Sequence, residues 1–422
     1  MKKFLKGLFL LYGIYAAIII SYFLFIADST NLPINYQGSA ADPATFMNER
    51  QMELTYEYSK IRHIIFFLLT PFDWVLFLTI LAVGLSVRFR NWSNSVTRIS
   101  VFQKGIYVFW LSIFTFIVMF PIDYISYQLS KSYGITTSTF PIWLKDQFID
   151  FWLDYLFMAL MAIVVYALIK KFNKKWWIYA WIISVPFTVF LMFVQPVIID
   201  PLYNDFYPLK DKELEEKILN LASKADIPAE HVYEVNMSEK TNALNAYVTG
   251  IGSNSRIVLW DTTLSKLDDN EVLFVMAHEM AHYVKKHIYM GMAAYLIISL
   301  IGLFIASKLL EWAVKRFGDP LRIKGIHDIA SLPLLLLIIS MLTFVQSPIS
   351  NAFSRSLEHS ADEYAIEMTK DKVSAISGFQ KLTIAGLSEV NPPVIVKWLR
   401  YGHPTMLERL NFLENYDVNQ SK

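Results

Sequence analysis

Residues 271–287, EVLFVMAHEMAHYVKKH, join a metal-binding pattern to an apolar run that follows at 288–307. His278 and His282 stand four residues apart, with Glu279 beside the first of them. Positions i and i+4 share one face of an α-helix, so both imidazoles can reach one ion while Glu279 lies next to it. The segment therefore predicts a metal-binding helix at the edge of a membrane domain, and Asp268, Asp269 and Asn270 are candidates for its N-cap.

The rest of the chain is dominated by apolar blocks of membrane-spanning length. Of 422 residues, 55% are hydrophobic and 18% charged, whereas soluble domains average roughly 45 to 50% and 25%. Each block is close to the ~20 residues that cross a bilayer as a helix. The first follows two lysines, but it is too long for a signal peptide and no cleavage motif follows it. We expect seven spans, at about 4–26, 64–87, 106–127, 151–169, 176–199, 288–307 and 329–349.

Two stretches, 200–287 and 350–422, have the composition of soluble protein. The first contains a charged helix and short runs typical of strands at 231–235, 244–249 and 256–260. We expect a mostly α fold, a polytopic membrane protein in which about seven transmembrane helices enclose a chamber and carry a small α+β catalytic domain. The expected domains are a five-helix membrane domain at 1–199, a first catalytic segment at 200–287, spans six and seven at 288–349, and a second catalytic segment at 350–422.

Charge and cysteine content exclude several classes of function. The 38 Lys and Arg nearly balance the 37 Asp and Glu, and the net charge of +1 gives no basic field for nucleic acid. We therefore expect no nucleic-acid partner. The chain has no Cys, so disulfides, thiolate ligands and a Cys nucleophile are excluded. Any metal must be held by His, Asp or Glu.

The distribution of basic residues predicts an orientation in the cell membrane. Loops on the side of the N-terminus hold 16 Lys and Arg, and the opposite loops hold five. Because basic loops stay in the cytoplasm, we expect a multi-pass protein with a cytoplasmic N-terminus. With seven spans, both soluble stretches and the catalytic face then lie outside. His63 and His327 border spans, and we expect them at the membrane interface.

A catalytic zinc has three protein ligands, so one ligand lies outside the H-E-x-x-H pattern, which is typical of zinc peptidases. His287 would point about 140° away if the same helix continued to it. The segment 351–365, NAFSRSLEHSADEYA, offers Glu358 and Asp362 at the i, i+4 spacing. One carboxylate could bind the metal while the other accepts an imidazole N–H. Spacing does not say which does which, and His359 and Glu363 remain candidates.

Several strings together resemble the type I CAAX prenyl proteases, which are integral-membrane zinc endopeptidases. The resemblance covers nearly the whole chain, including seven spans and the placing of the motifs around spans five to seven. It implies a zincin-like catalytic domain. The strings are PLYNDFYPL (201–209), NAYVTGIGSNSRIVLWDTTL (245–264), HEMAH (278–282), SRSLEHSAD (354–362) and GHPTMLERL (402–410).

The resemblance implies a role for each matching residue. One Zn²⁺ per chain would be bound by His278, His282 and Glu358, and Glu279 would be the catalytic base. Asp362 would be the supporting, proton-donating acid. One position departs from the family pattern, because His359 stands where an aromatic residue commonly follows the zinc-binding Glu.

The motifs at 402–410 and 245–250 imply residues that bind the substrate. His403 and Arg409 would line the site, with His403 able to donate a hydrogen bond to the oxyanion and Arg409 contacting substrate. Residues 245–250 match the edge strand that pairs with an extended substrate, so Asn245, Ala246 and Tyr247 are expected to bind it.

The function implied is zinc-assisted hydrolysis of peptide bonds in a peptide or protein substrate, either lipidated or membrane-bound, with the lipid bilayer as the second partner. A quality-control protease of the heat-shock type is an alternative, although it has fewer spans. An intramembrane site-cleaving protease is disfavoured because Lys285 and Lys286 follow the motif. A seven-helix transporter or receptor with a structural zinc site would need a fourth ligand, such as His403 or His359.

Overall fold

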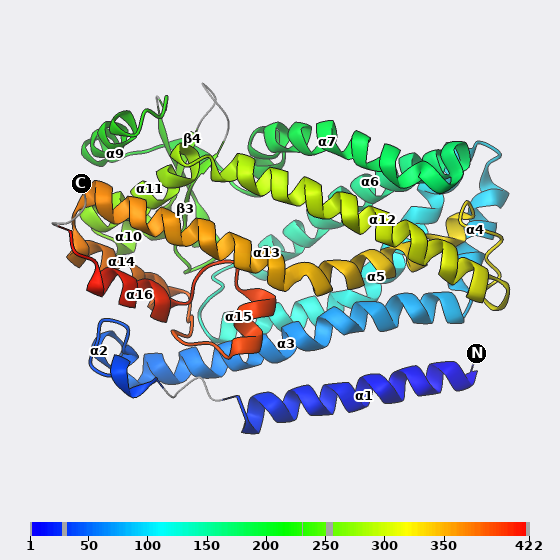
Figure 1. Ribbon diagram of the computed structural model, residues 1–422, viewed down its shortest axis with the longest axis horizontal. Helices are drawn as coiled ribbons and strands as arrows, with labels where there is room; N and C mark the ends of the chain where they lie inside the picture. The colour runs from blue at the N-terminus through cyan, green and yellow to red at the C-terminus, as the bar shows by residue number, and fades with distance from the viewer. Residues whose placement is uncertain (1, 28–31, 230, 250–255, 419–422) are drawn as a thin grey trace.

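The computed structural model describes residues 2–27, 32–229, 231–249 and 256–418. Six described stretches are long and apolar enough to cross a membrane, and one of them, Phe140–Tyr203, contains two separate helices. Seven spanning helices therefore run side by side (Figure 1), as the apolar blocks predict. They are α1 (Lys2–Phe25), α3 (Glu49–Ala82), α5 (Ser100–Ser132), α6 (Phe140–Phe172), α7 (Trp176–Val194), α12 (His287–Leu321) and α13 (Leu332–Thr369).

Two helix boundaries differ from the predicted spans. The block at 64–87 is not one helix, because Gly84 adopts a left-handed φ of 76° and separates α3 from α4 (Leu85–Val96). Glycine tolerates this conformation at no steric cost. In addition, α13 continues past the predicted end of span seven at 349 as far as Thr369. Glu358 and Asp362 therefore lie on the extension of a spanning helix.

A small sheet lies beside the metal-motif helix α11 (Asp269–Val284). Its order is β1-β2-β4-β3, in which β2 and β4 are parallel and the other pairs antiparallel. Three strands match the predicted runs, whereas β1 is a three-residue strand ending in proline, too short to give a pattern. The strands are β1 (Phe206–Pro208), β2 (Val232–Val235), β3 (Ala246–Thr249) and β4 (Arg256–Trp260). Because β3 pairs only with β4, it is an edge strand.

The two soluble stretches share one hydrophobic core. Helices α9 (Lys212–Lys224) and α11 from the first stretch pack with α14 (Lys372–Ala385) and α16 (Met406–Asn415) from the second. Phe274 and Phe379 meet edge to face in this core, with ring centroids 5.3 Å apart. The catalytic segments predicted at 200–287 and 350–422 thus form one folded unit, although two spanning helices separate them in sequence. The short helix α10 (Asp261–Lys266) follows β4, and α15 (Val394–Arg400) packs through Val396 on Phe23 of α1 and Phe67 of α3.

A second core closes the opposite end of the bundle. It is built from α4 and the ends of α3, α5, α6, α7, α12 and α13, with Tyr107, Tyr166 and Trp176 fully buried. A third, smaller buried cluster joins Phe23, Phe67 and Val396, whereas α6 has no buried residue before Ala159. This pattern is expected of helices that surround a chamber. The N-terminus lies at the far end of the bundle from the catalytic unit (Figure 1).

Replacement of Phe274 by alanine should destabilise the catalytic unit by about 3 to 5 kcal/mol, because the side chain is fully buried between both stretches. Thermal unfolding in detergent would show a lower Tm. Phe317→Ala, which removes a phenyl ring that is 42% exposed, is the matched control and should change Tm little. Equal effects of the two substitutions would contradict a shared core.

Candidate active site

The helix α11 is fixed at its N-terminus so that one face carries both motif histidines. Asp268 caps it, with Glu271 completing a capping box. Glu271 is buried and also accepts hydrogen bonds from Lys381 Nζ and Ser377 Oγ, both at 2.6 Å. One turn apart on this helix, the Nε2 atoms of His278 and His282 lie 3.3 Å from each other.

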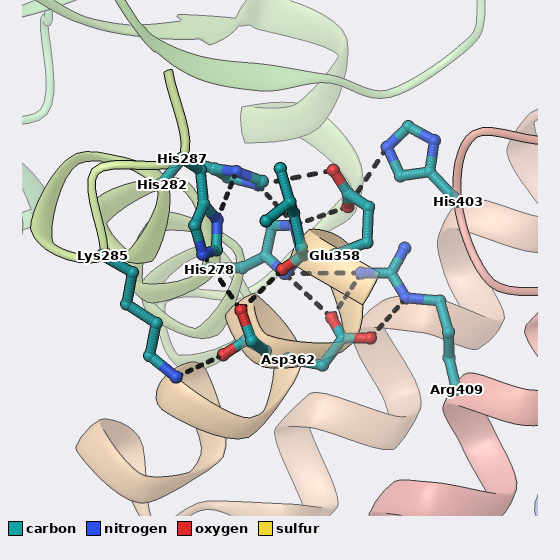
Figure 2. Close-up of polar contacts among 10 residues, drawn as sticks. His278, His282, Lys285, His287, Glu358, Asp362, His403 and Arg409 are labelled. Atoms are coloured by element: carbon teal, nitrogen blue, oxygen red, sulfur yellow. Dashed lines mark hydrogen bonds and ion pairs between the residues drawn. The ribbon is translucent and has the colours of Figure 1, made fainter. Parts of the chain in front are cut away.

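The extension of α13 packs across α11 and brings Glu358 to the two histidines (Figure 2). Glu358 Oε2 lies 3.2 Å from His278 Nε2, and Oε1 lies 3.5 Å from His282 Nε2. The three side chains offer ligand atoms within 4.8 Å of one another. The other candidates from this segment point elsewhere, because Glu363 is exposed and the His359 ring packs on Phe412 with centroids 4.7 Å apart.

The donor set fits a metal ion. Glu358 is 8% exposed, and its Oε2 atom is buried without accepting a hydrogen bond. A buried carboxylate oxygen without a donor is costly unless a cation satisfies it. Burial lowers the pKa of His278, but the contacts of its ring with the Asp362 and Glu358 carboxylates outweigh this and raise the pKa to about 9. The two carboxylates therefore favour positive charge at this point.

Asp362, one turn after Glu358, contacts the second ring nitrogen of His278, Nδ1. Its Oδ1 atom lies 2.8 Å from His278 Nδ1. Arg409 holds the same carboxylate with two hydrogen bonds, of 2.5 Å and 2.8 Å, and its guanidinium stacks 3.9 Å from the Phe379 ring. An Asp that accepts the Nδ1 proton leaves His278 Nε2 free to face a metal. Arg409, predicted to contact substrate, is 7% exposed and has its guanidinium on Asp362.

His287 lies close to His282, contrary to the prediction from a continuous helix. Helix α11 ends at Val284, and Lys286 has a left-handed φ of 59°, so α12 starts in a new direction at His287. His287 Nδ1 lies 3.1 Å from His282 Nδ1, and His287 Nε2 lies 3.0 Å from Ser360 Oγ. His287 is thus placed to accept the Nδ1 proton of His282, which orients His282 Nε2 toward Glu358.

Glu279 and His278 line a cavity of about 750 Å³. Burial, with a smaller contribution from the charge of Glu358, raises the pKa of Glu279 to about 7. A carboxylate with that pKa can both accept and return a proton near neutral pH. Burial and the neighbouring His278 lower the pKa of His282 to about 4, which keeps this imidazole in the neutral form that binds metal.

The predicted substrate-handling residues lie around this cavity. His403, Asn245 and Ala246 line it, and His403 Nε2 lies 3.3 Å from Glu358 Oε2. Tyr247 lines a neighbouring cavity of about 590 Å³ on the other side of Asn245. Of the predicted strand at 245–250, Gly250 lies outside the described residues.

Comparison with known proteins agrees with the fold and the metal-binding motif. Residues 208–417 match the model of peptidase family M48, and residues 34–205 match that of the CAAX prenyl protease N-terminal region of five membrane helices. The uncharacterized metalloprotease YhfN of Bacillus subtilis is 50% identical over 98% of this chain and 97% of its own. This chain belongs to peptidase family M48. It is a membrane metalloendopeptidase that acts on a peptide or protein substrate.

More distant members share the architecture. CAAX prenyl protease 1 of Saccharomyces cerevisiae is 28% identical over 82% of this chain and 78% of its own. The crystal structure of S. mikatae Ste24p superposes with a TM-score of 0.82 at 20% identity, covering 98% of both chains. The family resemblance inferred from the motifs is thereby confirmed.

Four cavity residues were missed by sequence reasoning. His63 is not at the membrane interface, because it is 2% exposed and lies between Glu389 and Arg400 in the cavity wall. Arg62 lines the same cavity. A basic pair just before an apolar span is a common feature of membrane proteins. No signal in the sequence distinguishes His63, because its partners Glu389 and Arg400 lie 326 and 337 residues away.

Replacement of His287 by alanine should weaken metal binding by about 10- to 100-fold, the usual effect of losing a partner that orients a metal-binding His. Competition with a chelator would measure the affinity. His359→Ala, whose ring packs away from the site, is the matched control. Unchanged affinity in the His287 variant would show that the contact with His282 does not orient the ligand.

Proposed function

We propose that this chain is a zinc-dependent endopeptidase whose metal is held by His278, His282 and Glu358. The observation that carries the proposal is the three-residue donor set, of which His278 lines, together with Glu279, a cavity that also reaches an edge strand. Two imidazole nitrogens and one carboxylate are a ligand set typical of catalytic zinc. When bound, zinc supplies a Lewis acid that polarises the scissile carbonyl and acidifies water.

Glu279 is the proposed general base. It accepts a proton from the attacking water and returns it to the leaving amine when the peptide bond breaks. The pKa of about 7 suits both directions of transfer. Because the Glu279 carboxylate is largely buried, the proton is transferred without exchange with bulk water.

Asp362 and Arg409 are proposed to position His278. The bidentate Arg409–Asp362 pair is buried and stacked on Phe379, so the Asp362 carboxylate is held rigidly against His278 Nδ1. In this arrangement Asp362 has a supporting role rather than direct contact with the reacting atoms. Arg409 acts through Asp362.

His403 is proposed to stabilise the oxyanion. It enters from the loop before α16, on the opposite side of Glu358 from the two motif histidines (Figure 2). Its Nε2 atom lies 3.3 Å from Glu358 Oε2, so its ring is next to a residue that would hold the zinc. A hydrogen-bond donor there acts on the charge that develops as water adds to the carbonyl.

The edge strand β3 is proposed to bind an extended substrate. Trp260 N donates to Asn245 O at 3.1 Å, so Asn245 and Tyr247 direct their backbone groups toward β4. The alternation of an antiparallel ladder directs those of Ala246 and Val248 to the open edge. The Ala246 N–H is already taken by Asn245 Oδ1, which leaves Val248 as the first free position for pairing.

Two alternatives receive less support. A structural zinc site needs four protein ligands, but within the described part of the chain the metal-binding group comprises three residues and excludes His359 and His403. A quality-control protease of the heat-shock type has fewer spans than the seven helices seen here. We further propose that the substrate is membrane-bound or lipidated, because relatives are named as CAAX prenyl proteases, and that nucleic acid is not a partner.

Substitution of Glu279 by glutamine should abolish turnover, by about 10²-fold or more, while zinc binding is kept. The measurement is cleavage of a quenched fluorescent peptide library in detergent, with metal content determined in parallel. Glu363→Gln, an exposed acid outside the site, should retain activity. Proteolysis by the Glu279 variant at the wild-type rate would remove its role as base.

The catalytic unit is proposed to face outward, with the N-terminus in the cytoplasm, on the basis of the basic loops. The chain has no Cys, so single cysteines can be placed without background. In intact cells an impermeant thiol reagent should label Ser223→Cys on α9, and Asn94→Cys at the other end of the bundle should react only after lysis. The reverse pattern would place the active site in the cytoplasm.

A further inference from the structure

Two arginines line the catalytic cavity away from the metal-binding residues. Arg62 lies on α3 and Arg400 ends α15, and both border the cavity that Glu279 and His278 line. The cavity therefore carries, besides the catalytic acid and the metal-binding residues, a pair of guanidinium groups with no part in the proposed chemistry.

Arg400 is held in place by a buried relay. Its Nη1 donates to His63 Nδ1 at 2.7 Å, and His63 Nε2 contacts Glu389 Oε1. His63 and Glu389 are each 2% exposed. Because Nδ1 accepts from the guanidinium, the ring proton lies on Nε2 and is donated to Glu389. The imidazole thus separates the Glu389 carboxylate from Arg400.

Arg62 is oriented by a buried ring. Its guanidinium carbon lies 5.4 Å from the centre of the Tyr58 ring, one turn earlier on α3, and the Tyr58 hydroxyl is 3.0 Å from Ser130 Oγ. The guanidinium carbon of Arg400 lies 5.6 Å from the ring of Phe66, one turn after Arg62. Both arginines are therefore arranged along one face of α3.

The charge of this pair is not neutralised within the protein. Within the described residues, no carboxylate forms an ion pair with Arg62 or Arg400. Burial and then repulsion by Arg62 lower the pKa of Arg400. Arg62 is exposed and Arg400 is partly buried, and a cavity lined by two positive charges attracts an anionic ligand. Their fork of N–H donors matches a carboxylate in a bidentate arrangement.

We propose that Arg62 and Arg400 form a carboxylate-binding subsite of the catalytic cavity, with His63 and Glu389 positioning Arg400. The inference rests on the proposed peptidase function, since a peptide is the ligand that enters this cavity. A peptide presents a carboxylate from two sources, its free C-terminus and an Asp or Glu side chain. The subsite would select where along a substrate cleavage occurs.

The test uses three versions of one peptide that the wild-type protein cleaves: a C-terminal carboxylate, a C-terminal carboxamide, and a carboxamide in which one Gln is replaced by Glu. Purified full-length, zinc-loaded protein should cleave one carboxylate form with a kcat/KM about tenfold or more above the neutral carboxamide. The form that is preferred identifies the source of the carboxylate.

The variants Arg62→Gln and Arg400→Gln should lose this preference, so that the ratio of kcat/KM for the carboxylate peptide to kcat/KM for the carboxamide peptide falls toward one. Arg316→Gln, an exposed arginine on α12, is the matched control and should keep the wild-type ratio. Equal cleavage of all three peptides by the wild-type protein, or an unchanged ratio in both variants, would overturn the proposal.

Two further measurements separate this subsite from the peptidase function and from misfolding. Labelled carboxylate and carboxamide peptides can be titrated against the Glu279→Gln protein by fluorescence anisotropy, which reports the preference even if no peptide is cleaved. In the second measurement, unlabelled carboxylate and carboxamide peptides compete with the labelled peptide for the same protein. Both arginines are intact in this protein, so the result does not depend on whether the arginine variants fold. Tighter binding of a carboxylate form supports the subsite, and equal binding overturns it.

Discussion

The packing of α11 against the extension of α13 is the contact on which the active site depends. The proposed metal site needs both helices, because α11 supplies its two imidazoles and α13 its carboxylate. The crossing is fixed by the shared hydrophobic core and by polar links such as Lys285 Nζ to the Ser360 carbonyl at 2.9 Å. Because α13 also spans the bundle, the position of Glu358 is tied to the membrane domain.

Buried charge around this crossing makes the site rigid. Asp362 is fully buried, and Arg409 is nearly so. Removal of one member of such a pair typically costs about 3 to 5 kcal/mol, because the other charge is left uncompensated. The same pair fixes the tautomer of His278. The Arg409–Asp362 pair therefore contributes both to the stability of the fold and to the orientation of His278. Substitutions of Arg409 should affect folding and metal binding together.

Local patterns were sufficient where the chemistry is set within one helix. The i, i+4 spacing of His278 and His282 predicts their common face, and the apolar blocks predict the seven spans. Spacing failed where the chain changes direction or where partners are distant. His287 was excluded on a continuous helix, but the left-handed residue Lys286 turns it back toward His282. His63 was assigned to the interface, although it lies in the cavity wall.

The sequence by itself determined the spanning helices, the metal-binding motif and the family, because apolar length and helical periodicity are local properties. Spacing alone left Glu358 and Asp362 interchangeable, since both occupy one face of a helix, and the family resemblance assigned metal binding to Glu358. Only the tertiary structure decided that Glu358 faces both Nε2 atoms while Asp362 reaches Nδ1 of His278. It also brought Arg62 and Arg400 to one cavity. Such pairings depend on how helices pack, which no spacing along the chain specifies.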